Sequence, residues 1–75
     1  MNHHLHCTAA VVYATPRGRQ PASVHTVIPV ALAGLTGIAD MAARADAALK
    51  PLILHAAPDD ASSARYQLAL RLEAP

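Results

Sequence analysis

The stretch LHCTAAVVYA, residues 5–14, alternates as a β-strand does, and it decides the fold of this chain. Successive side chains of a strand point to opposite faces of a sheet, so every second residue shares a face. One face carries only apolar or small side chains: Leu5, Cys7, Ala9, Val11 and Tyr13. The other face is mixed and carries His4, His6, Thr8, Ala10 and Val12. We therefore predict a strand with one face in the core.

A second extended segment is expected to form a hairpin with the first, over residues 4–32. Residues 15–21 between them contain two prolines, a glycine and two arginines, a composition that favours a turn. A turn centred on Gly18 would place His25 opposite Val12 and about 20 Å from His6. Pro29 has no N–H for a central strand, so this strand should lie at a sheet edge or be bulged there.

An alanine-rich helix is predicted over residues 36–50, with Thr36 as its N-cap. Apolar residues recur at helical spacing in one stripe: Ile38, Met41, Ala42, Ala45, Leu49 and Leu52. Two acid–base pairs four residues apart, Asp40 with Arg44 and Asp46 with Lys50, mark the solvent face.

Pro51 should end the regular helix near Leu49 or Lys50, because a proline ring clashes with the preceding helical turn. Residues 52–56 could then form a short third strand. The segment 64–73 is a clear strand, in which Tyr66, Leu68, Leu70 and Leu72 alternate with polar residues. The predicted fold is a single α+β domain spanning residues 1–75, of the order ββα(β)β. Its three- to four-stranded, mainly antiparallel sheet has one alanine-rich helix on one face.

The composition predicts a thin core. Apolar residues make up 53% of the 75 residues, but aromatic residues only 3%, and the mean hydropathy is +0.25. Aromatic rings normally bring the largest buried area, so a second copy of the chain is the simplest way to cover the remaining apolar surface. We therefore expect a homodimer.

Cysteine and hydropathy both point to the cytoplasm. Cys7 is the single cysteine, so no disulfide can form within one chain, which suits a reducing compartment. The longest apolar stretch, residues 27–39, is interrupted by Pro29 and is shorter than the roughly 20 residues that span a bilayer. A cytoplasmic protein without membrane contact is expected.

The sequence offers no complete set of catalytic residues, and we expect neither enzyme activity nor a cofactor. Cys7 and His6 are adjacent on a strand and so point to opposite faces. The glycines at positions 34 and 37 do not build a phosphate-binding loop. His4 and His6 share a strand face and are weak metal-ligand candidates, since only His55 or Cys7 remains as a third ligand.

The densest charge lies at the predicted hairpin tip, and arginines there suit phosphate or an acidic protein surface. The residues expected to contact a partner are Arg17, Arg19, Gln20, Arg65 and Arg71. The formal net charge is only +1, which does not favour nucleic acid as the partner.

A hairpin followed by one alanine-rich helix and one or two strands resembles several small phage-encoded inhibitors, including some anti-CRISPR proteins. The resemblance implies an inhibitor that binds a larger protein or ribonucleoprotein assembly stoichiometrically. This non-enzymatic binding protein is the function we expect. Two alternatives stay open, namely a nucleic-acid-binding regulator that uses Arg17 and Arg19, and a metal-binding module that uses His4 and His6.

Overall fold

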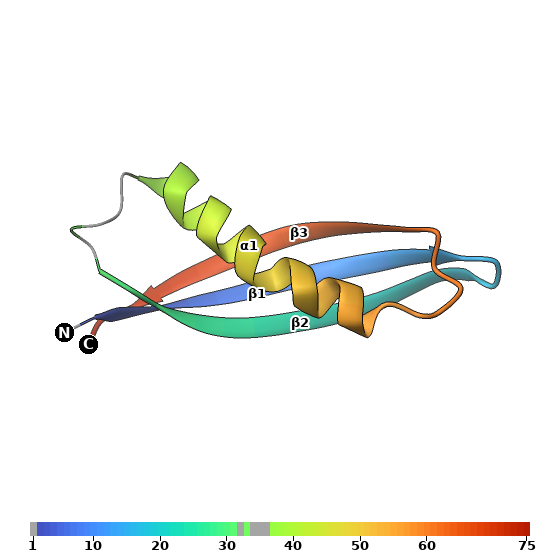
Figure 1. Cartoon of the computed structure of the whole chain (residues 1–75), viewed down its shortest axis with the longest axis horizontal. Coiled ribbons are helices and arrows are strands. Elements are labelled where there is room, and N and C mark those ends of the chain that lie inside the picture. Colours follow the sequence, from blue (N-terminus) through green and yellow to red (C-terminus); the bar gives the residue numbers. More distant parts are fainter. Residues whose placement is uncertain (1, 32, 34–36) are drawn as a thin grey trace.

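The computed structural model describes residues 2–31, 33 and 37–75. Within them the chain forms three strands and one helix in the order β1 (His3–Thr15), β2 (Gly18–Val30), α1 (Ile38–Ala56) and β3 (Ser63–Glu73) (Figure 1). The predicted α+β class and the helix on one face of an antiparallel sheet are confirmed, with three strands in these residues.

β1 is the central strand of the sheet, whose order is β2-β1-β3. Both neighbours are antiparallel to it, and the pairing with β2 runs without a break from His3 opposite Val30 to Thr15 opposite Gly18. The prediction that the strand with Pro29 lies at an edge is therefore confirmed, and no bulge is present along this ladder.

The hairpin turn lies earlier than predicted, and this changes the register. Only Pro16 and Arg17 separate the two strands, and Gly18 is already paired, with the positive φ of 113° that favours glycine. The hydroxyl of Thr15 donates to the carbonyl of Gly18 at 2.8 Å. His25 consequently lies opposite Thr8, whereas the expected opposition to Val12 was wrong. The predicted turn centre, Gly18, lies fewer than two residues past the observed centre. Moving the centre of a hairpin by one residue moves the partner of every strand residue by two, so a small error in the turn changes which residues are opposite.

The core lies between β1 and α1. All five inward residues of β1 are buried, and the helix contributes Ala45, Leu49 and Ile53. Val30 at the end of β2 completes the buried set. The inward residues of β3, including Tyr66 and Leu68, are only half-buried.

α1 continues past Pro51 to Ala56, so both the predicted end of the helix near Lys50 and the possible strand at residues 52–56 were wrong. Packing explains the difference, because Leu49 and Ile53 lie four residues apart on the buried side and fix the helix on β1. Ile53 takes the place on the stripe that was predicted for Leu52, which is 37% exposed.

The start of α1 also differs from the prediction. Thr36, the predicted N-cap, lies outside the described residues, and the residue before the helix is Gly37, whose φ is 139°. Ile38 was placed on the buried stripe, yet it is 77% exposed. Both predicted acid–base pairs are present, with nitrogen-to-oxygen distances of 3.4 Å in each.

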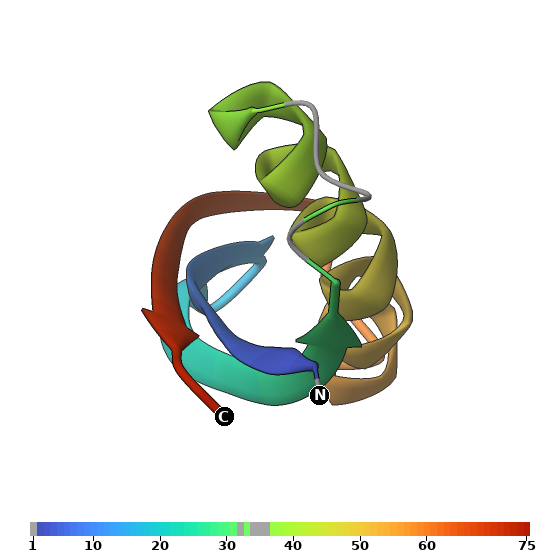
Figure 2. The same ribbon diagram turned by 90° about the vertical axis from the view of Figure 1, so that its left-hand side faces the viewer.

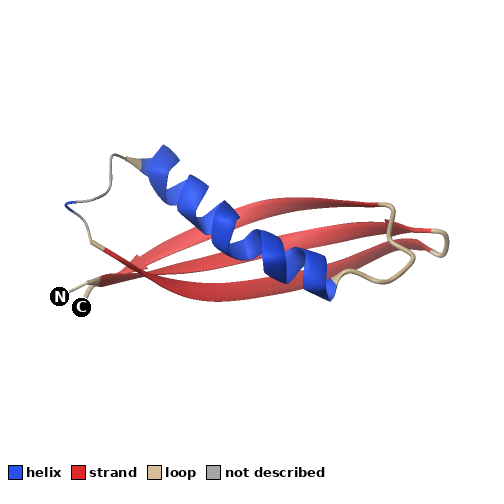
Figure 3. Ribbon diagram, in the orientation of Figure 1, coloured by secondary structure: helices blue, strands red, loops and turns tan. Residues whose placement is uncertain are grey.

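The molecule is elongated, with extents of 46 × 19 × 15 Å. Its radius of gyration is 14.0 Å, where about 11 Å is typical of a compact chain of this length. Seen along the long axis, the sheet curls and α1 lies on one side of it only (Figure 2). The strands run along the long axis and the helix crosses them obliquely (Figure 3). One whole face of the sheet is thus not covered by the helix.

Candidate binding face

The open face, as we name it, is the side of the sheet opposite α1. Because side chains alternate along each strand, the residues in register with the outward positions of β1 share this side. They are His4, His6, Thr8, Ala10, Val12 and Ala14 of β1, Arg19, Pro21, Ser23, His25, Val27 and Pro29 of β2, and Ser63, Arg65, Gln67, Ala69, Arg71 and Glu73 of β3.

The open face carries more positive charge than the rest of the chain. Outside it, Asp40, Asp46, Asp59 and Asp60 are nearly balanced by Arg17, Arg44 and Lys50, which leaves a formal charge of −1. The open face holds three arginines and a single carboxylate, that of Glu73, which is a formal charge of +2 with neutral histidines. The whole chain carries +1, so the positive charge is concentrated on the side that the helix leaves uncovered.

Arg19 and Arg65 come together at the turn end of the open face. Arg19 lies opposite Ala14 and Arg65 opposite Val12, so the two arginines flank the central strand from either side. With Ser63 they line a shallow hollow of about 330 Å³. Neither guanidinium has an ion pair or a side-chain hydrogen bond to another described residue.

The other three residues predicted to contact a partner lie elsewhere. Arg17, in the turn, faces Asp60 at 3.6 Å, so its charge is partly met within the chain. Gln20 is opposite Tyr13 and therefore belongs to the helix side of the sheet. Arg71 shares the open face but lies near its other end, six residues along β3 from Arg65. The five residues do not form one patch, and Arg19 with Arg65 is the pair that the fold brings together.

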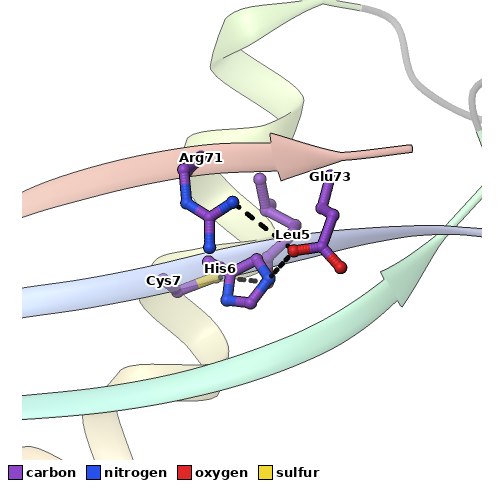
Figure 4. Close-up of polar contacts among 5 residues, drawn as sticks. All are labelled: Leu5, His6, Cys7, Arg71 and Glu73. Carbon is purple, nitrogen blue, oxygen red and sulfur yellow. Dashed lines mark hydrogen bonds and ion pairs between the residues drawn. The ribbon is translucent and has the colours of Figure 1, made fainter. Parts of the chain in front are cut away.

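A second polar group, the histidine cluster, spans all three strands near the end of β3. It consists of His6, His25, Arg71 and Glu73. His6 Nε2 lies 3.0 Å from Glu73 Oε2, which also accepts a hydrogen bond from Arg71 Nη1 at 3.4 Å (Figure 4). The His25 ring stacks on His6 with centroids 5.8 Å apart. His6 lowers the pKa of the Glu73 carboxyl, first by hydrogen bonding and then by its charge, and Arg71 adds to this.

The histidine cluster is relevant to the hypothesis that His4 and His6 bind a metal ion, because it brings further histidine and carboxylate side chains close to His6. The sequence interpretation placed His25 far from His6, and the observed register makes the two rings neighbours. His4 and His6 do share the open face, as expected. Among the described residues no three His, Cys, Asp or Glu side chains are grouped as a metal ion would require.

The middle of the open face is shallow and built from small or apolar residues. A hollow of about 740 Å³ is lined there by residues that include Ala10, Val12, Pro21 and Gln67. Val12 and Val27 are exposed. Tyr13 and Tyr66, the only aromatic residues besides histidine, are on the helix side, so no phenol or indole ring is offered for stacking on the open face.

Cys7 lies beneath the helix and is fully buried. Burial raises the pKa of its thiol, and Sγ donates to the carbonyl of Leu5 at 3.5 Å. The view of Cys7 as a small core residue, on the face opposite to His6, agrees with this geometry (Figure 4).

Comparison with known proteins gave no match, either to a family model or to a curated protein or solved structure. Among the described residues no helix has both the length and the apolar character that crossing a membrane would need.

Proposed function

We propose that this chain is a small non-enzymatic binding protein whose open face binds an acidic surface of a larger protein or ribonucleoprotein assembly, one copy to one site. The observation that carries the proposal is the pair Arg19 and Arg65, which flank β1 and have no ionic partner among the described residues. Guanidinium groups bind carboxylates through two parallel hydrogen bonds, and this geometry suits acidic protein surfaces.

The surroundings of the arginine pair support a flat protein–protein contact. Val12 lies between them, and the adjoining hollow is lined by small and apolar side chains. Apolar contacts at the centre with charged groups around them are typical of protein interfaces. A shallow face of this kind suits a broad partner surface better than a small molecule, which prefers an enclosed pocket.

An inhibitory role in the cytoplasm is part of the proposal. Its support is the layout of hairpin, alanine-rich helix and further strand, which resembles small phage-encoded inhibitors, including some anti-CRISPR proteins. Such an inhibitor would act by occupying a surface of its target, so its effect would saturate at a one-to-one ratio.

The test is an affinity capture from the native host with three versions of the tagged chain. The wild type should retain a partner, and an Arg19→Gln/Arg65→Gln variant should lose it. An Arg44→Gln/Lys50→Gln variant, which removes the same charge from α1, should retain it. The recovered partner is then titrated with purified chain by calorimetry, where we expect one-to-one binding and a loss of about tenfold or more in the double open-face variant. Full binding by Arg19→Gln/Arg65→Gln would contradict the proposal.

A nucleic-acid partner is the second candidate, and the observation that favours it is that Arg19, Arg65 and Arg71 all lie on the open face. Phosphate contacts by these arginines would make the affinity fall steeply with salt. We favour protein, because the open face has no phenol or indole ring for base stacking. Fluorescence anisotropy with DNA and RNA oligonucleotides at low salt distinguishes the two: salt-sensitive binding that Arg19→Gln/Arg65→Gln abolishes would replace the protein partner.

A further inference from the structure

The two edges of the sheet differ in their ability to accept another strand. β2 carries Pro21 and Pro29, and proline in an edge strand stands where its missing N–H faces outward. A strand pairing with β2 from outside would meet proline rings there instead of hydrogen-bond donors. β3 has no proline between Ser63 and Glu73, so its outward N–H and C=O groups form a regular ladder edge.

The helix side of β3 is also incompletely covered. α1 makes its most extensive contact with β2, at the other edge of the sheet. Tyr66, Leu68 and Leu70 are only half-buried, and Leu72 is 40% exposed although its β1 partner, Leu5, is fully buried. An apolar stripe that runs along a free strand edge is suited to burial by a strand added at that edge.

We infer that the occupant of this edge is β3 of a second copy, paired antiparallel about a two-fold axis at Ala69. The product is a dimer with one continuous sheet in the order β2-β1-β3-β3-β1-β2 and with both helices on the same side. This contact lies at the sheet edge and so goes beyond the proposed function of the open face, although Arg65 takes part in both contacts. Arg19 belongs to the open face alone and therefore separates the two.

The alternation of the strand restricts the register. Outward-pointing backbone groups recur at every second residue, so a symmetric pair must oppose residues of the same face. The axis then passes through a residue of β3 and not between two residues. Several registers satisfy this condition, and the most stable of them is decided by the interactions between side chains that lie directly opposite one another.

Charge complementarity selects Ala69 as the axis. Arg65 then lies opposite Glu73 of the second copy, and by symmetry the same pair forms twice. Arg65 has no ionic partner within the described part of its own chain. Glu73 already binds His6 and Arg71, but its side chain is 51% exposed and a carboxylate can accept further hydrogen bonds.

The neighbouring registers lack this match. An axis at Leu68 would place Arg65 opposite Arg71 twice, which is repulsive. An axis at Leu70 would carry Arg65 past the end of the partner strand. With the axis at Ala69 the helix side is matched as well, because Tyr66 meets Leu72 and Leu68 meets Leu70. The exposed Leu72 is thereby covered.

Charge reversal tests both the dimer and its register. In sedimentation equilibrium the wild type should dimerise, and Arg65→Glu should raise the dissociation constant by about tenfold or more, since two attractions become two repulsions. Glu73→Arg should do the same. The double variant Arg65→Glu/Glu73→Arg should restore the dimer, because each new pair is again opposite in charge. The control Arg19→Glu, on β2, should dimerise like the wild type.

A cross-link gives an independent readout. Residues directly opposite in an antiparallel pair have Cα atoms about 4.5–5.5 Å apart, which is within disulfide range. Ala69→Cys should therefore form a disulfide-linked dimer on mild oxidation, while Gln67→Cys on the same face should not, because it meets Arg71 of the second copy. The native Cys7 is buried and should not compete.

Three results would overturn the inference. The first is a wild-type chain that stays monomeric at several hundred micromolar, and the second is a charge-swapped double variant that stays as weak as the single variants while its circular dichroism is native. The third is loss of the dimer in Arg19→Glu, which would move the contact to the open face. The Ala69→Cys cross-link and the Arg19→Glu control leave Arg65 unchanged, so they report on the dimer whether or not Arg65 also contacts a partner through the open face.

Discussion

Tyr13 joins the end of the central strand to the end of the helix. Its ring is buried, and its hydroxyl donates to the carbonyl of Ile53 at 2.6 Å. Carbonyls in the last turn of a helix have no partner within the helix, so a side chain has to satisfy any that is buried. The alternation of residues 5–14 predicts that Tyr13 faces the core. The alternation cannot predict that the hydroxyl of Tyr13 binds the carbonyl of Ile53. Ile53 is 40 residues away and belongs to the helix only because α1 continues past Pro51.

Tyr13→Phe should lower the free energy of unfolding by about 1–3 kcal/mol, because it leaves a buried carbonyl without a donor. Denaturant titration followed by circular dichroism measures the change. Thr15→Ala is the matched control, since its hydroxyl bond to Gly18 is exposed, and it should change stability by only about 0.5 kcal/mol. Equal effects of the two substitutions would show that the Tyr13 bond is not an important contact.

Among the elements, α1 shows how packing overrides a local preference. Pro51 cannot donate to the carbonyl of Ala47, and the sequence alone therefore predicts that the helix stops. The helix nevertheless runs for 19 residues, with Leu49 and Ile53 both buried against the sheet. β1 and β3 were predicted closely because alternation is a local property, whereas β2 begins within the residues predicted to form the turn. The length of α1 depends on tertiary contacts that no local pattern of residues 50–56 contains.

Pro51→Ala should stabilise the protein by about 1–3 kcal/mol, because it restores the missing donor and relieves the clash of the ring with the preceding turn. The rise is measured as an increase in the denaturant midpoint at unchanged m-value. Pro21→Ala serves as the comparison, since Pro21 lies in an edge strand and should change stability by only about 0.5 kcal/mol. A destabilised Pro51→Ala variant would mean that the ring itself makes a needed contact.

Across the whole molecule, polar contacts tie the C-terminal strand to the rest of the fold. Tyr66 of β3 donates to Asp46 of α1 at 2.6 Å, while Glu73 of β3 is bound to His6 of β1. The hydrogen bond from Tyr66 is the main reason why the pKa of Asp46 is lowered, and Asp46 raises the pKa of Tyr66 in turn.

These shifts define a pH window of stability. The pKa values of Asp46 and Glu73 lie below their ordinary values of 3.8 and 4.5, so their contribution is present above those values and is lost as the pH falls further. The pKa of Tyr66 lies above its ordinary value of 10.0, so its contribution is present below that value and is lost as the pH rises through the shifted one. Burial raises the pKa of Cys7 above its ordinary value of 9.0 in the same way, so thermal melts should show a plateau between about pH 5 and pH 9 with a fall on either side.

Tyr66→Phe separates the two ends of this window. It should lower the melting temperature within the plateau, weaken the loss of stability at high pH, and also weaken the part of the acid loss that comes from Asp46. Glu73→Gln should weaken only the acid loss. A Tyr66→Phe profile parallel to that of the wild type at every pH would contradict the proposed link between Tyr66 and Asp46.

The candidate site shows the same division between local and long-range information. The alternation of residues 64–73 alone predicts that Arg65 and Arg71 share one face of a strand. The contact between His25 and His6 depends on where the hairpin turns. The approach of Arg19 to Arg65 depends on the position of that turn and also on the pairing of β1 with β3. A shift of a residue or two in the turn, which composition cannot resolve, decides which side chains meet across the sheet.

The strand order β2-β1-β3 also affects the order in which the strands can pair during folding. β1 is the first element along the chain but the middle strand in space, and it pairs with β2 through a turn of two residues. Its other partner comes last, with His4 opposite Glu73. The hairpin can close early, whereas the nearest pair of the second ladder, Ala14 with Ser63, can form only by closing a loop over residues 15–62, with the slow folding that such distant pairing brings. During synthesis, one side of β1 therefore stays unpaired until β3 has emerged from the ribosome.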